Sequence, residues 1–230
     1  MKFIRGQLTK QQVSESFILA SLLAFVGGYL DAYTYFCRGH VFANAQTGNI
    51  IFLGLNIGNG DYLKAASYLI PILAFILGVL LAEGVREHYQ YKSDINIHWR
   101  QIIVLFELAI MGIVALVPSG KYDLMVNVAI SFVCSLQAES FRKVNGNAYA
   151  STMCTGNLRS GSEQLYKAVI HHDQTAKKHA LQYFMIIALF IIGAVMSMYL
   201  TQFLMEKSIL ISVAVLAIVF IIMFIESKND

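Results

Sequence analysis

Residues 44–50 read Asn-Ala-Gln-Thr-Gly-Asn-Ile, and residues 152–158 read Thr-Met-Cys-Thr-Gly-Asn-Leu, 108 positions later. Each motif opens a segment that cannot cross a bilayer alone. Gly48–Gly58 is apolar but has only 11 residues, which makes a helix of about 16 Å, roughly half of the ~30 Å hydrocarbon core. Asn157–Ile170 is longer but carries three charged residues. Both segments are therefore predicted to be re-entrant half-helices, which enter the membrane and return on the same side.

The composition around these motifs is that of a membrane protein. Hydrophobic residues make up 57% of the 230 residues and charged residues only 13%, with a mean hydropathy of +0.60. A soluble domain is nearer half apolar and a quarter charged, so a large helical core in water is the disfavoured alternative. Residues 1–230 are expected to form a single membrane domain. A net charge of +3 offers no electrostatic footprint for nucleic acid, and none is expected as a partner.

Six other segments have the length and apolarity of membrane-spanning helices. Pro118 follows the third of them, as expected of a residue that ends a helix. The fold class is therefore predicted as an all-α membrane protein with six transmembrane helices and two re-entrant half-helices. The predicted spans are Phe17–Phe36, Ala66–Val85, Gln101–Val117, Leu124–Phe141, Ala180–Leu204 and Ser208–Ile225.

The distribution of Lys and Arg distinguishes re-entrant segments from crossing ones. If both short segments return to the side they came from, 13 basic residues lie on the cytoplasmic side and 4 outside. If both cross instead, the split is 9 against 7, with Arg159 unassigned. Because cytoplasmic loops of membrane proteins carry an excess of Lys and Arg, the re-entrant arrangement is favoured. It predicts a multi-pass protein of the cell membrane with both termini in the cytoplasm.

The two halves of the chain align beyond the motifs. At the offset of 108, Asp31 falls on Glu139, and at an offset of 115 the stretch 75–78 resembles 190–193. Each half then contains three spans and one re-entrant segment, with repeat one at about 14–118 and repeat two at about 122–226. Because three is an odd number, the second half must start from the opposite side of the membrane. This is a 3+3 inverted repeat, an arrangement common among secondary transporters that bind their solute near the midplane.

In this arrangement the chain is expected to turn at the two Thr-Gly-Asn triplets, where glycine allows unusual dihedral angles and close backbone approach. Both half-helices would then begin near the bilayer centre, with their N-termini facing each other. A helix N-terminus offers unpaired N–H donors and partial positive charge, and two such ends predict a site for a small solute, an anion or a carboxylate among them. In the alternative, the Thr and Asn side chains of the motifs only cap their own helices. The candidate binding residues are Asp31, Asn44, Gln46, Thr47, Gly48, Asn49, Glu139, Thr155, Gly156 and Asn157.

Three acidic residues lie inside predicted spans, where a carboxylate is costly and usually faces a cavity. Asp31, Glu139 and Glu107 are therefore candidate proton-coupling residues. In the alternative, Asp31 and Glu139 lie close enough to helix ends to reach water, and Glu107 pairs with a basic group.

The sequence shows no set of residues typical of an enzyme. It has no nucleophile elbow, phosphate loop or haem motif, and the three Cys residues lack disulfide or zinc spacing. The histidines of the stretch 171–179 match no standard metal site and are expected in a solvated loop. No catalytic residue, metal or cofactor is predicted.

Several stretches are similar to a known family. Gly-Gly-Tyr-Leu-Asp-Ala-Tyr at 27–33, Val-Phe-Ala-Asn-Ala-Gln-Thr-Gly-Asn at 41–49 and Cys-Thr-Gly-Asn-Leu-Arg at 154–159 resemble the YoaK family of uncharacterised bacterial multi-pass membrane proteins. The likeness covers nearly the whole chain and departs from the family at 36–40, where one Gly stands instead of a pair. It implies a cell-membrane location and supplies no substrate.

The leading functional hypothesis is a secondary transporter of a small solute. No ATP-binding motif is present, so a gradient or simple facilitation would drive the movement. The expected partners are a small-molecule or ion solute and the lipid bilayer, and a homodimer would be compatible with six spans. Two alternatives stay open: a channel lined by the half-helices, and a non-transporting scaffold or sensor that docks partners on residues 157–173.

Overall fold

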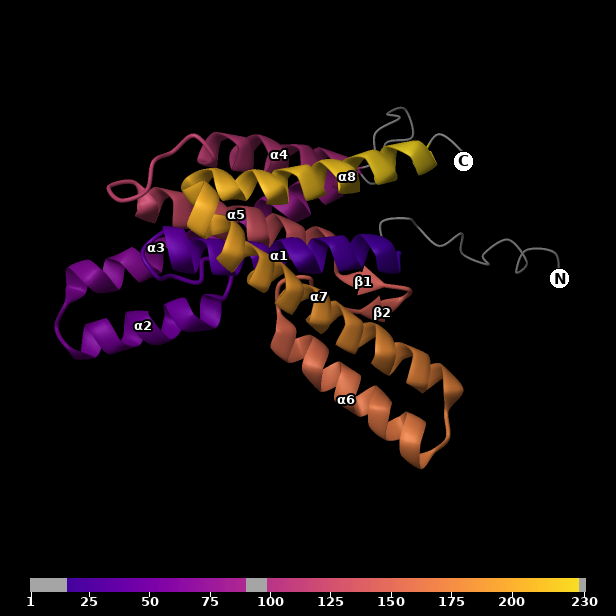
Figure 1. The fold of residues 1–230 in the computed structure, drawn as a ribbon. Helices are drawn as coiled ribbons and strands as arrows, with labels where there is room; N and C mark the ends of the chain where they lie inside the picture. Colours follow the sequence, from indigo (N-terminus) through magenta and orange to yellow (C-terminus); the bar gives the residue numbers. More distant parts are fainter. Residues whose placement is uncertain (1–15, 90–98, 228–230) are drawn as a thin grey trace.

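The computed structural model describes residues 16–89 and 99–227, which are almost entirely helical. Figure 1 shows the helices and one short hairpin, whose Asn145-Gly146 turn has positive φ at both residues, as tight hairpins require. The elements are α1 (Phe17–Cys37), α2 (Gln46–Gly58), α3 (Tyr62–Tyr89), α4 (Trp99–Val114), α5 (Asp123–Ser140), β1 (Lys143–Val144), β2 (Asn147–Ala148), α6 (Cys154–Ile170), α7 (Gln174–Leu204), the 3₁₀ helix η2 (Met205–Ile209) and α8 (Leu210–Ser227).

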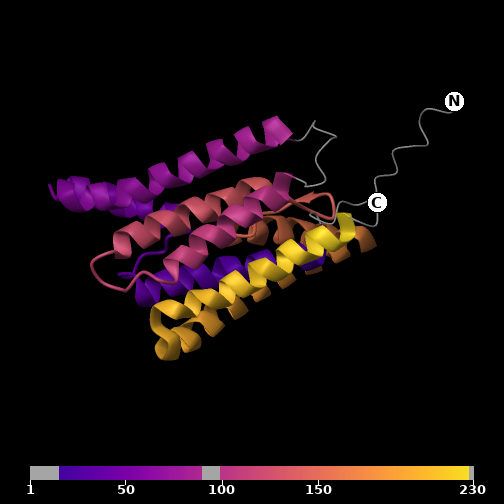
Figure 2. The same ribbon diagram turned by 90° about the horizontal axis from the view of Figure 1, so that it is seen from above.

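The long helices alternate in direction. In Figures 1 and 2, α1, α4 and α7 run one way, α3, α5 and α8 run the other way, and α1 begins at the end of the molecule where α8 finishes. The short helices both begin near the middle: α2 runs toward the end where α1 finishes, whereas α6 runs toward the opposite end. Each short helix then packs beside the long helix that follows it, α2 with α3 and α6 with α7.

The two halves of the chain exchange their main packing partners. Helix α1 packs along α7, and α5 packs along α3. Each contact closes on a glycine of the aligned stretches: an added Cβ at Gly193 would collide with the Phe25 carbonyl of α1, and one at Gly78 would collide with Ser135 Oγ of α5. The absence of a side chain at Gly78 and Gly193 therefore lets each helix pair approach closely.

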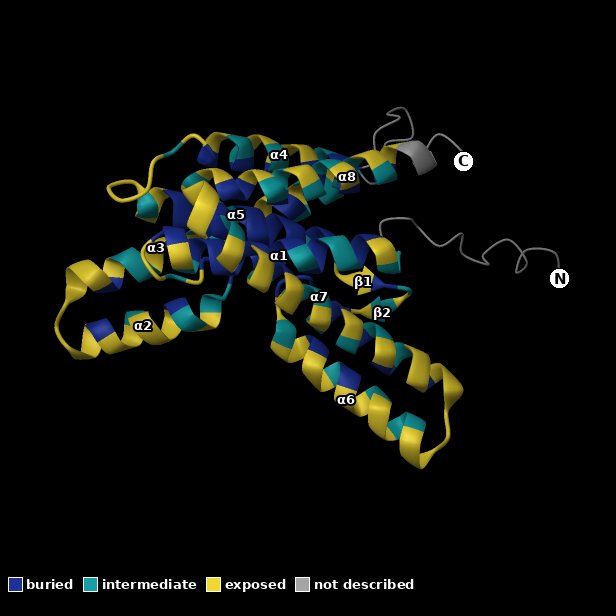
Figure 3. Cartoon of the chain, viewed as in Figure 1, coloured by how far each residue is buried: buried dark blue, intermediate teal, exposed yellow. Residues whose placement is uncertain are grey.

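Helix α1 lies at the centre of this arrangement and is buried along most of its length, while α2 and α6 are largely exposed (Figure 3). Its apolar side chains join those of α4, α5 and α8 in the largest core cluster. Many large apolar side chains on α3, α7 and α8 are instead exposed. A soluble monomer rarely exposes so much apolar surface, whereas lipid would cover it.

Three stretches of the described residues are long and apolar enough to cross a membrane: Phe17–Cys37, Tyr62–Tyr89 and Gln174–Phe224. The last contains both α7 and α8, which fold back on each other at η2. Of the other predicted spans, α4 has only 16 residues, and α5 is interrupted by polar residues. A helical membrane-type fold is confirmed, whereas the number of spans stays a prediction.

The basic residues used in the charge count are only partly described. Lys2, Arg5, Lys10, Lys92 and Lys228 lie outside the described residues. The orientation of the chain in the membrane therefore stays a prediction.

Replacement of Gly193 by alanine tests the close contact between α1 and α7. Gly193→Ala is expected to lower the free energy of unfolding by about 1–3 kcal/mol, because overpacking forces the two backbones apart. Gly84→Ala is the matched control, since no atom lies within 4 Å of a Cβ there and alanine favours helix. Thermal unfolding in detergent compares the two variants. Equal losses from both would contradict the close packing at Gly193.

Candidate functional site

The loop before α2 is held by polar side chains of α1. The carboxylate of Asp31 accepts a hydrogen bond from the Asn44 backbone N–H at 3.1 Å. One turn later, the Thr34 hydroxyl accepts from the Ala43 N–H at 3.2 Å. Asp31 and Thr34 are both buried. The first motif is therefore anchored on one face of α1, deep in the protein.

The first turn of α2 is tied to α3 and α5 by a chain of hydrogen bonds. The Gln46 side chain donates to Ser131 Oγ on α5 at 2.6 Å, and Ser131 donates to the Pro71 carbonyl on α3 at 2.8 Å. Asn49, which is buried, donates to Gln46 Oε1 at 3.1 Å. This chain holds two of the candidate binding residues in a fixed relation to three helices.

The loop before α6 is held differently. Asn157 pairs with both backbone groups of Ala150, donating to its carbonyl at 2.6 Å and accepting from its N–H at 3.2 Å. Gln137 on α5 donates to Ser151 Oγ at 2.7 Å and to the Leu23 carbonyl of α1 at 3.2 Å. The second motif is thus held by side-chain amides rather than by a carboxylate.

Neither short helix is capped by a side chain. Ala45 and Met153 occupy the N-cap positions and make no capping hydrogen bond, so the Thr and Asn residues of the motifs do not cap these helices. Thr47 and Thr155 are exposed. Both helices begin near the middle of the protein, and in the first turn of α2 the Gln46 and Gly48 N–H groups already bind the Asn44 and Ala45 carbonyls.

The helices begin earlier than the Thr-Gly-Asn turns that the sequence suggested. Gly48 and Gly156 lie inside the first helical turns, outside the left-handed region, and no atom lies within 4 Å of a Cβ built at either residue. The expectation that these glycines adopt an unusual dihedral angle is therefore wrong. The chain has already turned before Gln46 and Cys154.

The two motifs meet on α1. The Ser151 carbonyl lies 2.9 Å from a Cβ built at Gly27, while Asn44 binds Asp31, and these two positions of α1 are one turn, about 6 Å, apart. The loops before α2 and α6 therefore approach the same stretch of α1.

Two buried polar groups beside these helix ends have no hydrogen-bond partner among the described residues. They are the amide of Asn44, whose Oδ1 and Nδ2 both lack a partner, and the hydroxyl of Thr152, on residues that are 3% and 6% exposed. They occupy equivalent positions at the offset of 108. A buried polar atom without a partner is costly, so a ligand or water that bound there would satisfy both.

The other two acidic candidates lie away from Asp31's loop contacts. Glu139 pairs with Arg142 at 3.0 Å, and Arg142 also reaches Glu83 at 3.3 Å, beside a cavity of about 140 Å³ at the end of α5. Glu139 is thus part of an ion-pair cluster. Glu107 is fully buried on α4, and neither of its oxygens has a hydrogen-bond partner among the described residues.

Arg38, which the charge count above includes among the four basic residues outside, is fully buried. Its Nε and Nη2 donate to the Tyr33 hydroxyl at 2.9 and 2.7 Å, and Nη2 also donates to the Val117 carbonyl at 2.7 Å. Nη1 donates to Asp123 at 3.3 Å. Asn127 of α5 donates to the Arg38 carbonyl at 2.8 Å. The four-residue spacing of Asp123 and Asn127, which places both on one face of α5, was the sequence signal that could have indicated a polar partner there.

No group of three or more His, Cys, Asp or Glu in the described part of the chain could hold a metal ion. Within the histidine-rich stretch, Asp173 is the N-cap of α7 and accepts from the Thr175 and Ala176 N–H groups. This segment therefore has a structural role at the α6–α7 turn.

The family described as "Protein of unknown function (DUF1275)" matches residues 19–222. The chain belongs to this family. It is 29% identical over 152 residues to the UPF0700 transmembrane protein YoaK of Bacillus subtilis (strain 168), a match over 64% of this chain and 66% of the relative, just under two thirds of its length. The resemblance to the YoaK family is confirmed. No solved structure matches the chain.

The buried arginine of this DUF1275 protein should be essential for stability. Arg38→Gln removes the guanidinium that joins α1 to Asp123 and Val117, and is expected to cost on the order of 3 kcal/mol, as when one partner of a buried pair is lost. Arg159→Gln, at an exposed position, is the control and should change the unfolding temperature little. A wild-type unfolding temperature for Arg38→Gln in detergent would argue against the buried network.

Proposed function

We propose that this protein is a secondary transporter of a small solute in the cell membrane, with the solute bound between the two motif loops. The single observation that carries the proposal is the meeting of two uncapped helix N-termini beside the carboxylate of Asp31. Six spans, two re-entrant half-helices and cytoplasmic termini are part of the proposal.

The exchanged packing of the halves supports an inverted repeat. Helices α1 and α5 hold aligned positions in the two repeats, and each packs on the glycine-bearing helix of the other half, at Gly193 and Gly78. The short helices α2 and α6 run toward opposite ends of the molecule (Figure 1). Such pairs of mirrored, discontinuous helices surround the midplane sites of known transporter folds.

The chemistry of the loops supports binding of a small polar molecule. The N-termini of α2 and α6 carry partial positive charge and favour an anionic group. The buried Asn44 amide and Thr152 hydroxyl can each donate and accept, and neither has a hydrogen-bond partner among the described residues. Asp31 would take up a proton in exchange for its hydrogen bond to the loop, and this would couple loop position to a proton gradient.

A polar face of α5 supports a route through the protein. Every fourth residue from the start of the helix to its end is polar, and two cavities lie at its ends, of about 210 Å³ near the start and about 140 Å³ near the end. Between them Ser135 packs against Gly78, which closes the interface of α3 with α5. A closed centre between two polar cavities fits a carrier better than an open channel. The polar residues are Asp123, Asn127, Ser131, Ser135 and Glu139.

A transport assay with Asp31→Asn tests the proposal. Purified protein in proteoliposomes is expected to take up one member of a panel of radiolabelled organic acids and amino acids, saturably and faster under an inward proton gradient. Asp31→Asn should reduce the stimulation of uptake by the proton gradient at least tenfold. The amide keeps an acceptor for the Asn44 N–H but cannot exchange a proton. Asp61→Asn is the control, since Asp61 is an exposed residue that bonds the Lys64 N–H.

Three outcomes would count against the carrier. Gradient-driven uptake by Asp31→Asn at the wild-type rate would remove Asp31 from coupling. Flux that does not saturate would favour a channel. A scaffold would be favoured if no solute were transported and if substitutions on the exposed face of α6 altered the set of proteins that bind this protein.

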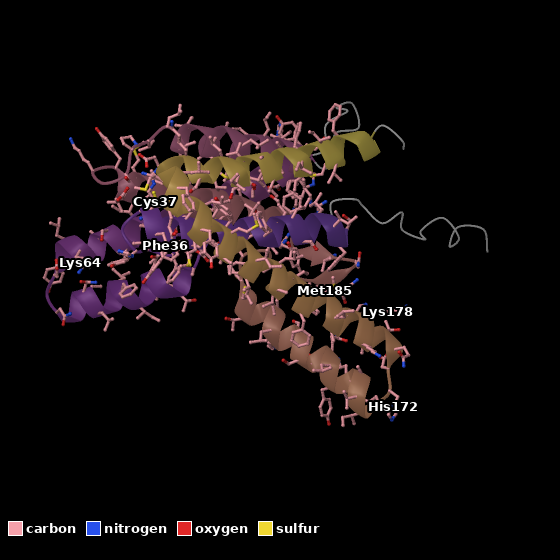
Figure 4. The ribbon with its side chains drawn as sticks, in the orientation of Figure 1. Phe36, Cys37, Lys64, His172, Lys178 and Met185 are labelled. Atoms are coloured by element: carbon pink, nitrogen blue, oxygen red, sulfur yellow. The ribbon has the colours of Figure 1, made fainter. Side chains whose placement is uncertain are left out.

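The orientation of the two short helices can be measured by cysteine labelling. Figure 4 shows Lys64 near the α2–α3 turn and His172 at the α6–α7 turn. In a background with Cys37, Cys134 and Cys154 changed to alanine, Lys64→Cys should react with an impermeant maleimide in whole cells. His172→Cys should react only in inverted vesicles. Labelling of both positions from the same side would contradict the inverted repeat.

A further inference from the structure

A second cavity lies beside the loop before α2 and is lined by none of the residues assigned to the proposed site. It has a volume of about 210 Å³ and is bounded by the residues after α1, the early part of α3 and the start of α5. Arg38, Asp123 and Asn127 supply its polar wall, and Ser67 and Tyr68 of α3 lie opposite. The mechanism proposed above does not use this cavity as a binding site.

The guanidinium of Arg38 has one donor to spare. Of its five N–H groups, those on Nε and Nη2 bind the Tyr33 hydroxyl and the Val117 carbonyl, and one on Nη1 binds Asp123 at 3.3 Å. The remaining Nη1 N–H has no partner in the described residues. A fully buried guanidinium with a free N–H beside a cavity is suited to a carboxylate, which binds arginine strongly.

Helix α5 offers acceptor oxygens to the same cavity. Asn127 is 3% exposed, its amide N–H₂ is used by the Arg38 carbonyl, and its Oδ1 has no partner among the described residues. One turn earlier, Asp123 carries a negative charge, and its side chain is 20% exposed. These two oxygens are suited to a donor with positive charge, such as an ammonium group.

We infer that this cavity binds a small zwitterion of the size of an α-amino acid, with its carboxylate on Arg38 and its ammonium on Asp123 and Asn127. Because Arg38 and Asp123 pair with each other at 3.3 Å, the wall has no net charge, and a ligand that carries both charges matches it better than a ligand with one. The two charges of the wall are adjacent, as are those of an α-amino acid.

The cavity lies next to residues of the proposed transport site. Its role as an access site rests on the proposed transport function. Asn127 lies one turn before Ser131, which binds Gln46 of the first motif. The Tyr68 ring is held against Phe52 of α2, with ring centroids 5.2 Å apart. A solute in the cavity would therefore contact the helix pair that carries the first motif.

Binding of radiolabelled glycine, L-alanine and L-serine to the purified full-length protein tests the inference, with acetate and methylammonium as single-charge probes. At least one amino acid should bind saturably, and at least tenfold more tightly than either probe. Asn127→Leu, which removes the free acceptor, and Ser67→Phe, which fills the cavity, should each weaken binding at least tenfold. Asn147→Leu, on β2, is the control and should bind as the wild type does.

Tyr68→Phe keeps the ring contact with Phe52 and is therefore expected to fold. It should bind the amino acid more weakly than the wild type, because it removes a hydroxyl from the cavity wall. Absence of binding by all three amino acids, equal binding of acetate, or unchanged binding by Ser67→Phe would overturn the inference. The two proposals fail separately. Amino-acid binding that persists in Asp31→Asn without any transport would refute the transporter alone, whereas proton-driven transport of a solute that does not bind this cavity would refute the zwitterion site alone.

Discussion

Two stretches of non-helical backbone lie buried in the middle of this protein, and their hydrogen-bonding groups must be satisfied from within. In a membrane no water is available at that depth, and an unpaired amide or carbonyl costs several kcal/mol. Asp31 and Thr34 of α1 receive the N–H groups of the loop before α2. Asn157 pairs with both backbone groups of Ala150 before α6. The short helices can begin at the centre because these side chains replace water.

This requirement explains the unusual character of α1 and α5. Both helices are largely buried and carry polar residues, because they face the loops and not lipid. Ser131 and Gln137 on α5 each bind one loop, so α5 cannot be uniformly apolar. The apolar helices α3, α7 and α8 are found outside, where their exposed side chains would meet lipid.

The sequence predicted the helical elements closely because apolar runs and helix breakers are local signals. The first span was predicted to end at Phe36, and α1 ends at Cys37. Arg38 was missed for the opposite reason. Its partners Val117 and Asp123 lie 79 and 85 residues away, and a charge after an apolar run usually marks the membrane interface. Gly48 was assigned to a turn because no local signal shows that the chain has already turned before Gln46.

Asp31 and Glu139 align at the offset of 108 but make different contacts. Asp31 binds the loop that follows it, whereas Glu139 pairs with Arg142, three residues away, in an ion-pair cluster. The second loop is held by the amides of Gln137 and Asn157, which do not titrate. Under the proposed transport function, protonation would thus release one loop and leave the other in place. A repeat with a titratable anchor in only one half would respond to a proton from one side of the membrane, and this asymmetry would give transport its direction.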